Sequence, residues 1–284
     1  MFLKSILPFI AIGFFLLALL FRRREAGASG WIFIAGYCYF EASHYFAQDE
    51  YFDASLALVF LAFSLLLAFF MLKPMSVPAP GEKGEADLFF TITKVALITA
   101  VFYFPFSEIP FLYDSLIYST AKITATMLNL FNPGSVYMDY PPSFIYSTST
   151  SFDVEIILAC TAIQSMVLFI GLIFGVNAPM RRKLKAFFVS VPVIYGLNIF
   201  RNVFVVTAYF EQWFASPRWQ WFLQWFIRAP SSQSFDIAHN VIARIGVMIS
   251  LIIIAYAVFV ILPEALDLVE DFFRFIFKTT KRNN

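Results

Sequence analysis

Phe52–Leu72 reads FDASLALVFLAFSLLLAFFML, a run in which Asp53 is the only charged side chain. About 20 apolar residues are enough for an α-helix to cross the hydrocarbon core of a bilayer, so this stretch predicts a transmembrane helix. The whole chain agrees, because 60% of its 284 residues are apolar and only 14% are charged, whereas soluble domains average about 45–50% and about 25%. This composition excludes a soluble domain, and a net charge of +1 provides no basic surface for nucleic acid. We therefore predict an all-α fold, a polytopic bundle of transmembrane helices.

The same length criterion predicts about seven spans. The second is the weakest, because it is short and contains Glu41 and His44. Another segment, Ile109–Phe131, is long enough to span but partly polar, so it is either an interfacial helix or an eighth span. Pro-Gly and Pro-Pro breaks in residues 132–153 then predict a small extramembrane loop or hairpin. The predicted spans are Ser5–Phe21, Trp31–Ala47, Phe52–Leu72, Leu88–Phe106, Glu155–Ala178, Ala186–Phe210 and Ile237–Leu262.

The basic residues predict the orientation, since short cytoplasmic loops are rich in Lys and Arg. With seven spans and the N-terminus outside, every basic cluster lies on the cytoplasmic side, provided that Ile109–Phe131 does not cross. Amphipathic helices at the membrane surface are expected at 211–236, which holds four Trp residues, and at Glu264–Lys278. The chain is thus expected to comprise N-terminal transmembrane helices at 1–106, an extracytoplasmic loop and interfacial segment at 107–154, a transmembrane catalytic core at 155–262 and a cytoplasmic tail at 263–284.

Polar groups inside the spans indicate where function lies, because charge is costly there. At about 1.5 Å per residue, three consecutive spans place Cys160, Arg201 and the pair His239 and Arg244 toward the outer face. His239 and Arg244 are five positions apart, about 140° around an α-helix, so one of the two should point at Cys160 and the other elsewhere. Further polar residues share these faces by i, i+3 or i, i+4 spacing: Asn198 and Asn202 with Arg201, Gln164 with Cys160, and Asn240 with Arg244.

A thiol beside a guanidinium group suits acyl transfer, because positive charge favours the nucleophilic thiolate and can stabilise an oxyanion. Cys160 with Arg201 and a third polar group therefore predicts a nucleophilic site. Two other interpretations stay open at this point. Cys160 is a packing residue in one, and in the other a helical-bundle transporter or receptor binds an anionic ligand through Arg201 and Arg244.

Three segments resemble motifs of the exosortase/archaeosortase family. Residues 159–165 read ACTAIQS, similar to the family's A-C-[ST]-x-[IL]-x-S stretch. Residues 198–202, NIFRN, resemble its N-x-x-R-[NI] motif, and residues 238–246, AHNVIARIG, resemble the third. The resemblance covers about 100 residues, and the archaeosortase A type is most similar because its third catalytic group is Arg. Ala162 departs from the pattern, where Gly is expected after Cys-Thr.

The resemblance implies a membrane cysteine protease or transpeptidase, a thiol hydrolase that processes the C-termini of secreted surface proteins. It implies a substrate tail with a Pro-Gly-Phe motif, a transmembrane helix and a basic cluster, and transfer of the new C-terminus to a lipid, with a polar phospholipid as acceptor. Cys160 would be the nucleophile, Arg201 would stabilise the thiolate or oxyanion, and Arg244 or His239 would complete the site. The family implies no metal or organic cofactor. The enzyme would lie in the plasma membrane with its site toward the extracytoplasmic face.

Overall fold

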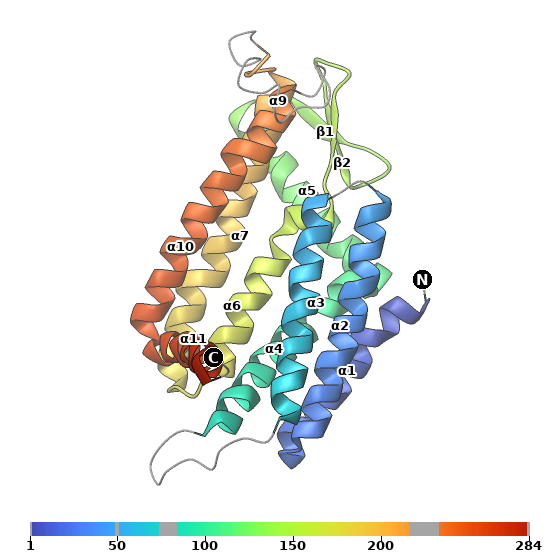
Figure 1. The fold of residues 1–284 in the computed structure, drawn as a ribbon. Helices are drawn as coiled ribbons and strands as arrows, with labels where there is room; N and C mark the ends of the chain where they lie inside the picture. Colours follow the sequence, from blue (N-terminus) through green and yellow to red (C-terminus); the bar gives the residue numbers. More distant parts are fainter. Residues whose placement is uncertain (1, 49–50, 74–83, 216–232, 283–284) are drawn as a thin grey trace. The chain divides into compact units, whose positions relative to one another are not determined.

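The computed structural model describes residues 2–48, 51–73, 84–215 and 233–282. Within these ranges the chain is mostly helical, with one small antiparallel sheet (Figure 1). Two compact units interleave along the sequence. Unit 1 comprises Met1–Glu108, Val167–Lys183 and Leu262–Asn284, and unit 2 comprises Ile109–Met166 and Leu184–Ile261. The expected parts 1–106, 107–154, 155–262 and 263–284 were defined by membrane side, and that division stays a prediction.

Five helical stretches among the described residues are long and apolar enough to cross a membrane. Two predicted spans are not among them. Helix α2 (Arg24–Ala47) matches the predicted weak second span, and polar side chains along its length make it less apolar than the five. Helix α6 (Ile163–Gly175) is apolar but has only 13 residues. The five candidate spans lie in α1 (Phe2–Phe21), α3 (Tyr51–Leu72), α4 (Glu85–Glu108), α7 (Met180–Phe210) and the stretch Gln233–Ile261.

The predicted fifth span, Glu155–Ala178, is wrong at its start. Strand β3 (Asp153–Glu155) and the 3-10 turn η1 (Leu158–Thr161) occupy its first residues, and α6 begins only at Ile163. The break occurs at Ala162, whose φ of 58° and ψ of 13° are left-handed. A residue in that conformation cannot continue a right-handed helix, so the chain turns before α6 starts.

Unit 1 is built on close contacts between helices. A Cβ atom added at Gly30 of α2 would lie 2.5 Å from Phe15 of α1, and one at Gly171 of α6 would lie 2.0 Å from the Thr99 hydroxyl of α4. These glycines therefore let the helix backbones approach each other, as small residues do in membrane bundles. An ion pair between Lys4 and Glu41, 2.9 Å long, joins α1 to α2.

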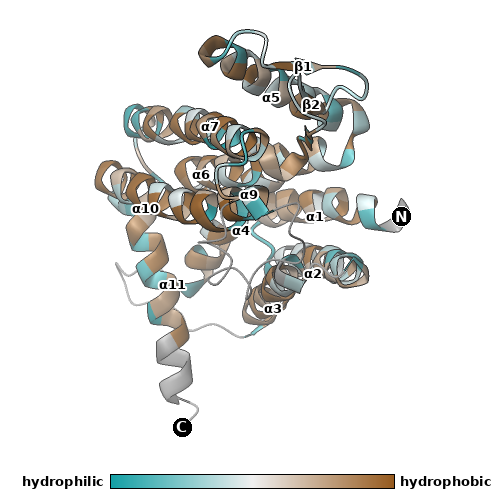
Figure 2. Ribbon diagram, turned by 90° about the horizontal axis from the view of Figure 1, so that it is seen from above, coloured by the Kyte–Doolittle hydropathy of each residue, from teal (hydrophilic) through white to brown (hydrophobic). Residues whose placement is uncertain are grey.

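Helix α11 (Pro263–Arg282) coincides with the amphipathic helix predicted in the C-terminal segment. Phe272 and Phe275 on its apolar face pack against the core of unit 1, and Phe275 meets the rings of Phe70 and Phe89 at centroid distances of 4.9 and 5.1 Å. Figure 2 shows hydrophilic residues along α11, in contrast to the largely hydrophobic α10 (Arg244–Ile261). The described helix is therefore anchored to unit 1 by its aromatic side chains.

Unit 2 combines membrane helices with a small sheet. Helix α5 (Pro110–Phe131), the segment that was either interfacial or an eighth span, packs through Ile117, Ala121 and Leu128 against the sheet. The sheet has the order β1 (Val136–Met138), β2 (Phe144–Ser147), β3 and is antiparallel throughout. The predicted hairpin at 132–153 thus forms, and it adds β-structure to the all-α class.

Unit 2 also contains η1, the start of α6, most of the long helix α7 and the helical region that follows residue 232. The short helix α9 (Gln233–Asp236) leads into a π-helix, η4 (Ile237–Ala243), and then into α10. Most of the Trp-rich segment predicted at 211–236, including three of its four Trp residues, lies outside the described residues. Trp213 is described, and its indole N–H donates to the Glu211 carboxylate over 2.6 Å.

Candidate active site

Cys160 lies in the turn between the sheet and α6. Its backbone N–H donates to the Ile157 carbonyl over 2.8 Å, which closes the 3-10 turn η1. The Thr161 hydroxyl donates to the Leu158 carbonyl and accepts the Ile163 N–H, so it caps α6. The expectation that Cys160 and Gln164 share a helix face is therefore wrong, since Cys160 precedes the helix. Gln164 is exposed in the first turn of α6.

Two asparagines of α7 hold the backbone at Cys160. The Asn198 and Asn202 side-chain amides donate to the carbonyl oxygen of Cys160, over 2.6 and 2.9 Å. Both side chains are buried, and they lie one helical turn apart, as the sequence spacing predicts. A carbonyl oxygen has two lone pairs, so this pair of donors saturates it. The turn that carries the thiol is thus fixed to α7.

Arg201 lies on the same face of α7 and connects that clamp to η4. One guanidinium nitrogen, Nη1, donates to Asn202 Oδ1 over 3.3 Å. The other, Nη2, lies 2.9 Å from His239 Nε2. Arg201 therefore bridges the asparagine that holds Cys160 and the histidine of η4.

His239 belongs to a chain of polar contacts that ends on a carboxylate. Its Nδ1 lies 3.1 Å from Asn240 Oδ1, and Asn240 Nδ2 donates to Asp236 Oδ1 over 3.2 Å. Because Asn240 Oδ1 and the Arg201 guanidinium have fixed roles as acceptor and donor, we assign the proton to Nδ1 and the lone pair to Nε2. The Phe235 ring stacks on the imidazole, 5.0 Å away and 8° from parallel.

The sequence predicts that one of His239 and Arg244 points at Cys160 and the other elsewhere. His239 lies within the π-helix η4, which covers 237–243, and Arg244 is the first residue of α10. His239 contacts Arg201, whereas Arg244 is exposed. The structure therefore brings Arg201 and His239 together, and the place of Arg244 in the site stays a prediction.

Sequence reasoning missed Asp236 and Phe235. Asp236 and Asn240 are four apart at the start of the last span, a spacing that could have indicated the contact. No comparable signal predicts the stacking of Phe235 on His239. Among the described residues, no three His, Cys, Asp or Glu side chains are grouped as metal ligands would be.

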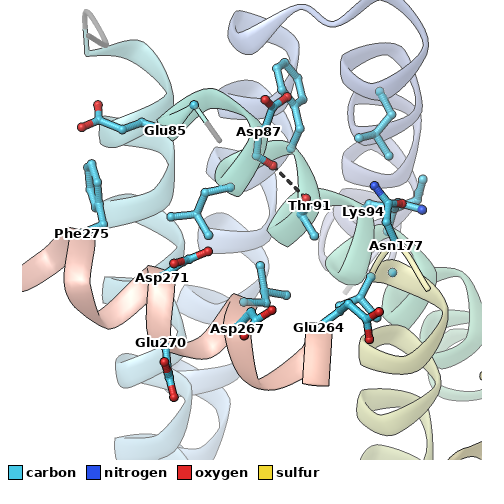
Figure 3. Close-up of a pocket in the computed structure, with 18 of the residues that line it drawn as sticks. Glu85, Asp87, Thr91, Lys94, Asn177, Glu264, Asp267, Glu270, Asp271 and Phe275 are labelled. Atoms are coloured by element: carbon cyan, nitrogen blue, oxygen red, sulfur yellow. Dashed lines mark hydrogen bonds between the residues drawn. The ribbon is translucent and has the colours of Figure 1, made fainter. Parts of the chain in front are cut away.

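The structure has a cavity in each unit. One of about 310 Å³ in unit 2 adjoins the residues above and includes Asn198 and Arg201 in its lining. A second, of about 1350 Å³, lies in unit 1 and contains none of the candidate site residues. Figure 3 shows that its polar lining comes mainly from α4 and α11: Glu85, Asp87, Thr91 and Lys94 on one side, Glu264, Asp267, Glu270 and Asp271 on the other.

Comparison with known proteins identifies the family. Residues 3–232 match the model of the transmembrane exosortase family. The chain belongs to the transmembrane exosortase family. Together with the apolar helices, this makes it a multi-pass membrane protein. The matched residues include Cys160 and Arg201 and stop before His239 and Arg244.

Two curated exosortase-family relatives are similar to the chain. Archaeosortase A of Natronomonas pharaonis is 33% identical over 199 residues, which cover 65% of this chain and 62% of the relative. Archaeosortase A of Haloferax volcanii is 28% identical over 200 residues, 65% of this chain and 66% of the relative. The chain thus spans slightly less than two thirds of the length of these relatives. No solved structure matches it at a significant level.

Proposed function

We propose that this exosortase-family member is a membrane-embedded cysteine transpeptidase that removes the C-terminal sorting tail of secreted surface proteins. The observation that carries the proposal is the continuous set of contacts from the Cys160 carbonyl through Asn202 and Arg201 to His239. It ties a thiol-bearing turn to a cation inside a membrane protein, where an unneeded cation would be costly. The similarity to two archaeosortases A supports the same class of reaction.

In the proposed reaction, the Cys160 thiol gives up its proton to solvent as it becomes the nucleophile. The thiolate sulfur attacks the carbonyl carbon of the scissile peptide bond. The C–N bond breaks, the leaving amine takes a proton from water, and the substrate remains joined to Cys160 as a thioester. Arg201 stabilises the oxyanion of the tetrahedral intermediate.

The second half of the reaction releases the thioester. The amine or hydroxyl of a polar phospholipid attacks the thioester carbon, the C–S bond breaks, and the acceptor's proton returns to solvent. The product is a surface protein with a lipid at its new C-terminus. Hydrolysis is the same step with water as acceptor.

We assign His239 a positioning role rather than that of a base. Its Nε2 accepts from Arg201 and its Nδ1 faces Asn240, so both ring nitrogens are engaged. We assign Arg244 an electrostatic role, because an Arg side chain stays protonated and does not act as a base. We place the site toward the extracytoplasmic face of the plasma membrane, which follows from the basic clusters on the opposite side.

The test is to co-express the full chain with a secreted reporter that ends in a Pro-Gly-Phe motif, a transmembrane helix and a basic cluster. Wild-type protein should shorten the reporter, and Cys160→Ala should abolish shortening. Cys38→Ala is the matched control, since Cys38 is a buried free cysteine of unit 1, remote in sequence from the site, and should keep full activity. Undiminished processing by Cys160→Ala would contradict the proposal. A silent Cys160→Ala, with anion binding lost in Arg201→Ala, would instead support the transporter alternative.

A further inference from the structure

The 310 Å³ cavity of unit 2 runs lengthwise between α7 and α10. Its lining extends from Ile194 to Phe204 on α7 and from Ile242 in η4 to Ile254 on α10, with Ala162 and Ser165 of the Cys160 region at one side. At about 1.5 Å per residue, ten to twelve residues of helix give it a length of roughly 15–18 Å. It is therefore a groove, open along one side, whose lining includes Asn198 and Arg201 of the candidate active site.

The cavity exists because small residues of α10 are not used for helix packing. A Cβ at Gly171 or Gly175 of unit 1 would collide with a neighbouring helix at 2.0 or 2.4 Å. Gly246, which lines the cavity, has no atom within 4 Å of the position of such a Cβ. Ser250 lines the cavity one turn further along. The surface at Gly246 and Ser250 therefore leaves room for an occupant beside α7.

The volume and the lining of the groove suit a single hydrocarbon chain. Most of the lining residues are apolar, and the volume is about 310 Å³. Since an apolar cavity of about 150 Å³ holds benzene, this groove has room for on the order of ten carbon atoms.

Polar groups lie along one part of the groove. Its lining is apolar at Ile194 and Ile254 and again at Phe204 and Ile242, and Asn198 and Arg201 lie between these ends. The Arg201 guanidinium has five N–H donors, and its contacts with Asn202 and His239 use two of them. An anionic phosphate group beside Arg201 would complement the positive charge. Exposed apolar side chains beside the lining, Ile245 and Ile249, provide continuity with lipid-facing helix surface.

We propose that this groove, the 310 Å³ cavity of unit 2, binds one hydrocarbon chain of a membrane phospholipid, with the phosphate group beside Arg201. Ala162 lines the cavity two residues after Cys160, so a lipid held there has its headgroup beside the turn that carries the thiol. The lipid is then the bound acceptor that attacks the thioester, a role that rests on the proposed function, whereas the binding itself does not.

The test is photocrosslinking of the purified full chain in phosphatidylcholine vesicles. The probe is a phosphatidylethanolamine that carries a diazirine in one acyl chain, and mass spectrometry locates the labelled peptides. We expect labelling within residues 194–204 and 242–254. Gly246→Leu fills the cavity and should lower this labelling at least about tenfold, and Ser250→Leu should do the same. Gly196→Leu is the matched control on α7, because Gly196 also faces open space but does not line the cavity.

Several outcomes would overturn the inference. Equal labelling of the wild type, Gly246→Leu and Ser250→Leu would show that the chain binds elsewhere. Labelling of the same peptides by a diazirine-bearing tail peptide, with none by the lipid, would assign the cavity to the substrate. With the tailed reporter, Gly246→Leu should also lower the ratio of lipid-joined to hydrolysed product. If the wild type leaves the reporter intact, the proposed function fails, while the crosslinking result still decides whether the cavity binds lipid.

Discussion

The clamp on the Cys160 carbonyl makes a quantitative prediction about non-additivity. Replacing Asn198 by Leu, which has a similar size and no donor, removes one hydrogen bond and should lower the free energy of unfolding by about 1 kcal/mol. Replacing Asn202 by Leu removes the other bond to the carbonyl and also the contact with Arg201. A hydrogen bond to a charged group contributes about 1.5–3 kcal/mol. Added to about 1 kcal/mol for the bond to the carbonyl, this loss should lower the free energy of unfolding of Asn202→Leu by about 2.5–4 kcal/mol.

The double variant should lose more than the sum of these values. In each single variant the Cys160 carbonyl keeps one donor, whereas in the double variant it has neither asparagine. A buried polar group without a partner costs a further ~1–3 kcal/mol. We therefore expect a coupling energy of about 1–3 kcal/mol between Asn198 and Asn202.

The assay is unfolding of the purified chain in mixed detergent micelles, followed by circular dichroism, for the wild type, both single variants and the double variant. The control pair is Asn198→Leu with Asn129→Leu. Asn129 bonds to the backbone of Val136 in the same unit and shares no hydrogen-bond partner with Asn198, so this pair should be additive. Coupling below about 0.5 kcal/mol between Asn198 and Asn202, no larger than in the control pair, would refute the clamp.

Three further predictions concern other parts of the structure. Ala162→Gly should stabilise the chain by about 1 kcal/mol in the same unfolding assay, because Gly adopts the left-handed conformation at φ 58° without the steric cost of a Cβ atom. A loss of stability in this variant would contradict the left-handed conformation of Ala162. His239→Ala frees Arg201 and should lower kcat for reporter cleavage more than it raises KM. His239→Gln keeps a hydrogen-bond acceptor and should restore part of the cleavage rate. Equal cleavage rates in the two variants would argue against a positioning role for His239. Gly171→Ala places a methyl group 2.0 Å from the Thr99 hydroxyl and should cost about 1–3 kcal/mol in thermal unfolding, whereas Gly196→Ala meets open space and should be neutral or stabilising.

The sequence predicted best those features in which polar residues recur at helical spacing within an apolar segment. Asn198, Arg201 and Asn202 were predicted on one helix face from spacing alone, and the hydrogen bonds of α7 agree with that face. Arg201 was prominent because charge is rare within apolar spans. The Pro and Gly breaks at 132–153 predicted a loop or hairpin, which the strands β1 and β2 form, whereas the third strand was not predicted. Each of these features depends on the type and spacing of residues that are close together in the chain, and a single sequence shows both directly.

Other features depend on backbone states that apolar composition does not encode. The run from Glu155 onward is as apolar as a helix, and nothing in its hydropathy reveals the turn at Ala162. The departure from the family's expected Gly at that position was the one available signal, and it indicated a left-handed residue rather than a packing change. The π-helix at 237–243 was equally hidden.

The central claim is that Cys160 forms a covalent bond with the substrate. The most direct measurement is intact mass spectrometry of the purified chain, incubated with a tailed reporter peptide in micelles that lack an amine-bearing lipid and quenched in acid. We predict an adduct equal in mass to the reporter without its tail, located on Cys160 by fragmentation, removed by hydroxylamine and absent from Cys160→Ala. Tail removal with no adduct on Cys160, or an adduct that persists in Cys160→Ala, would contradict the account.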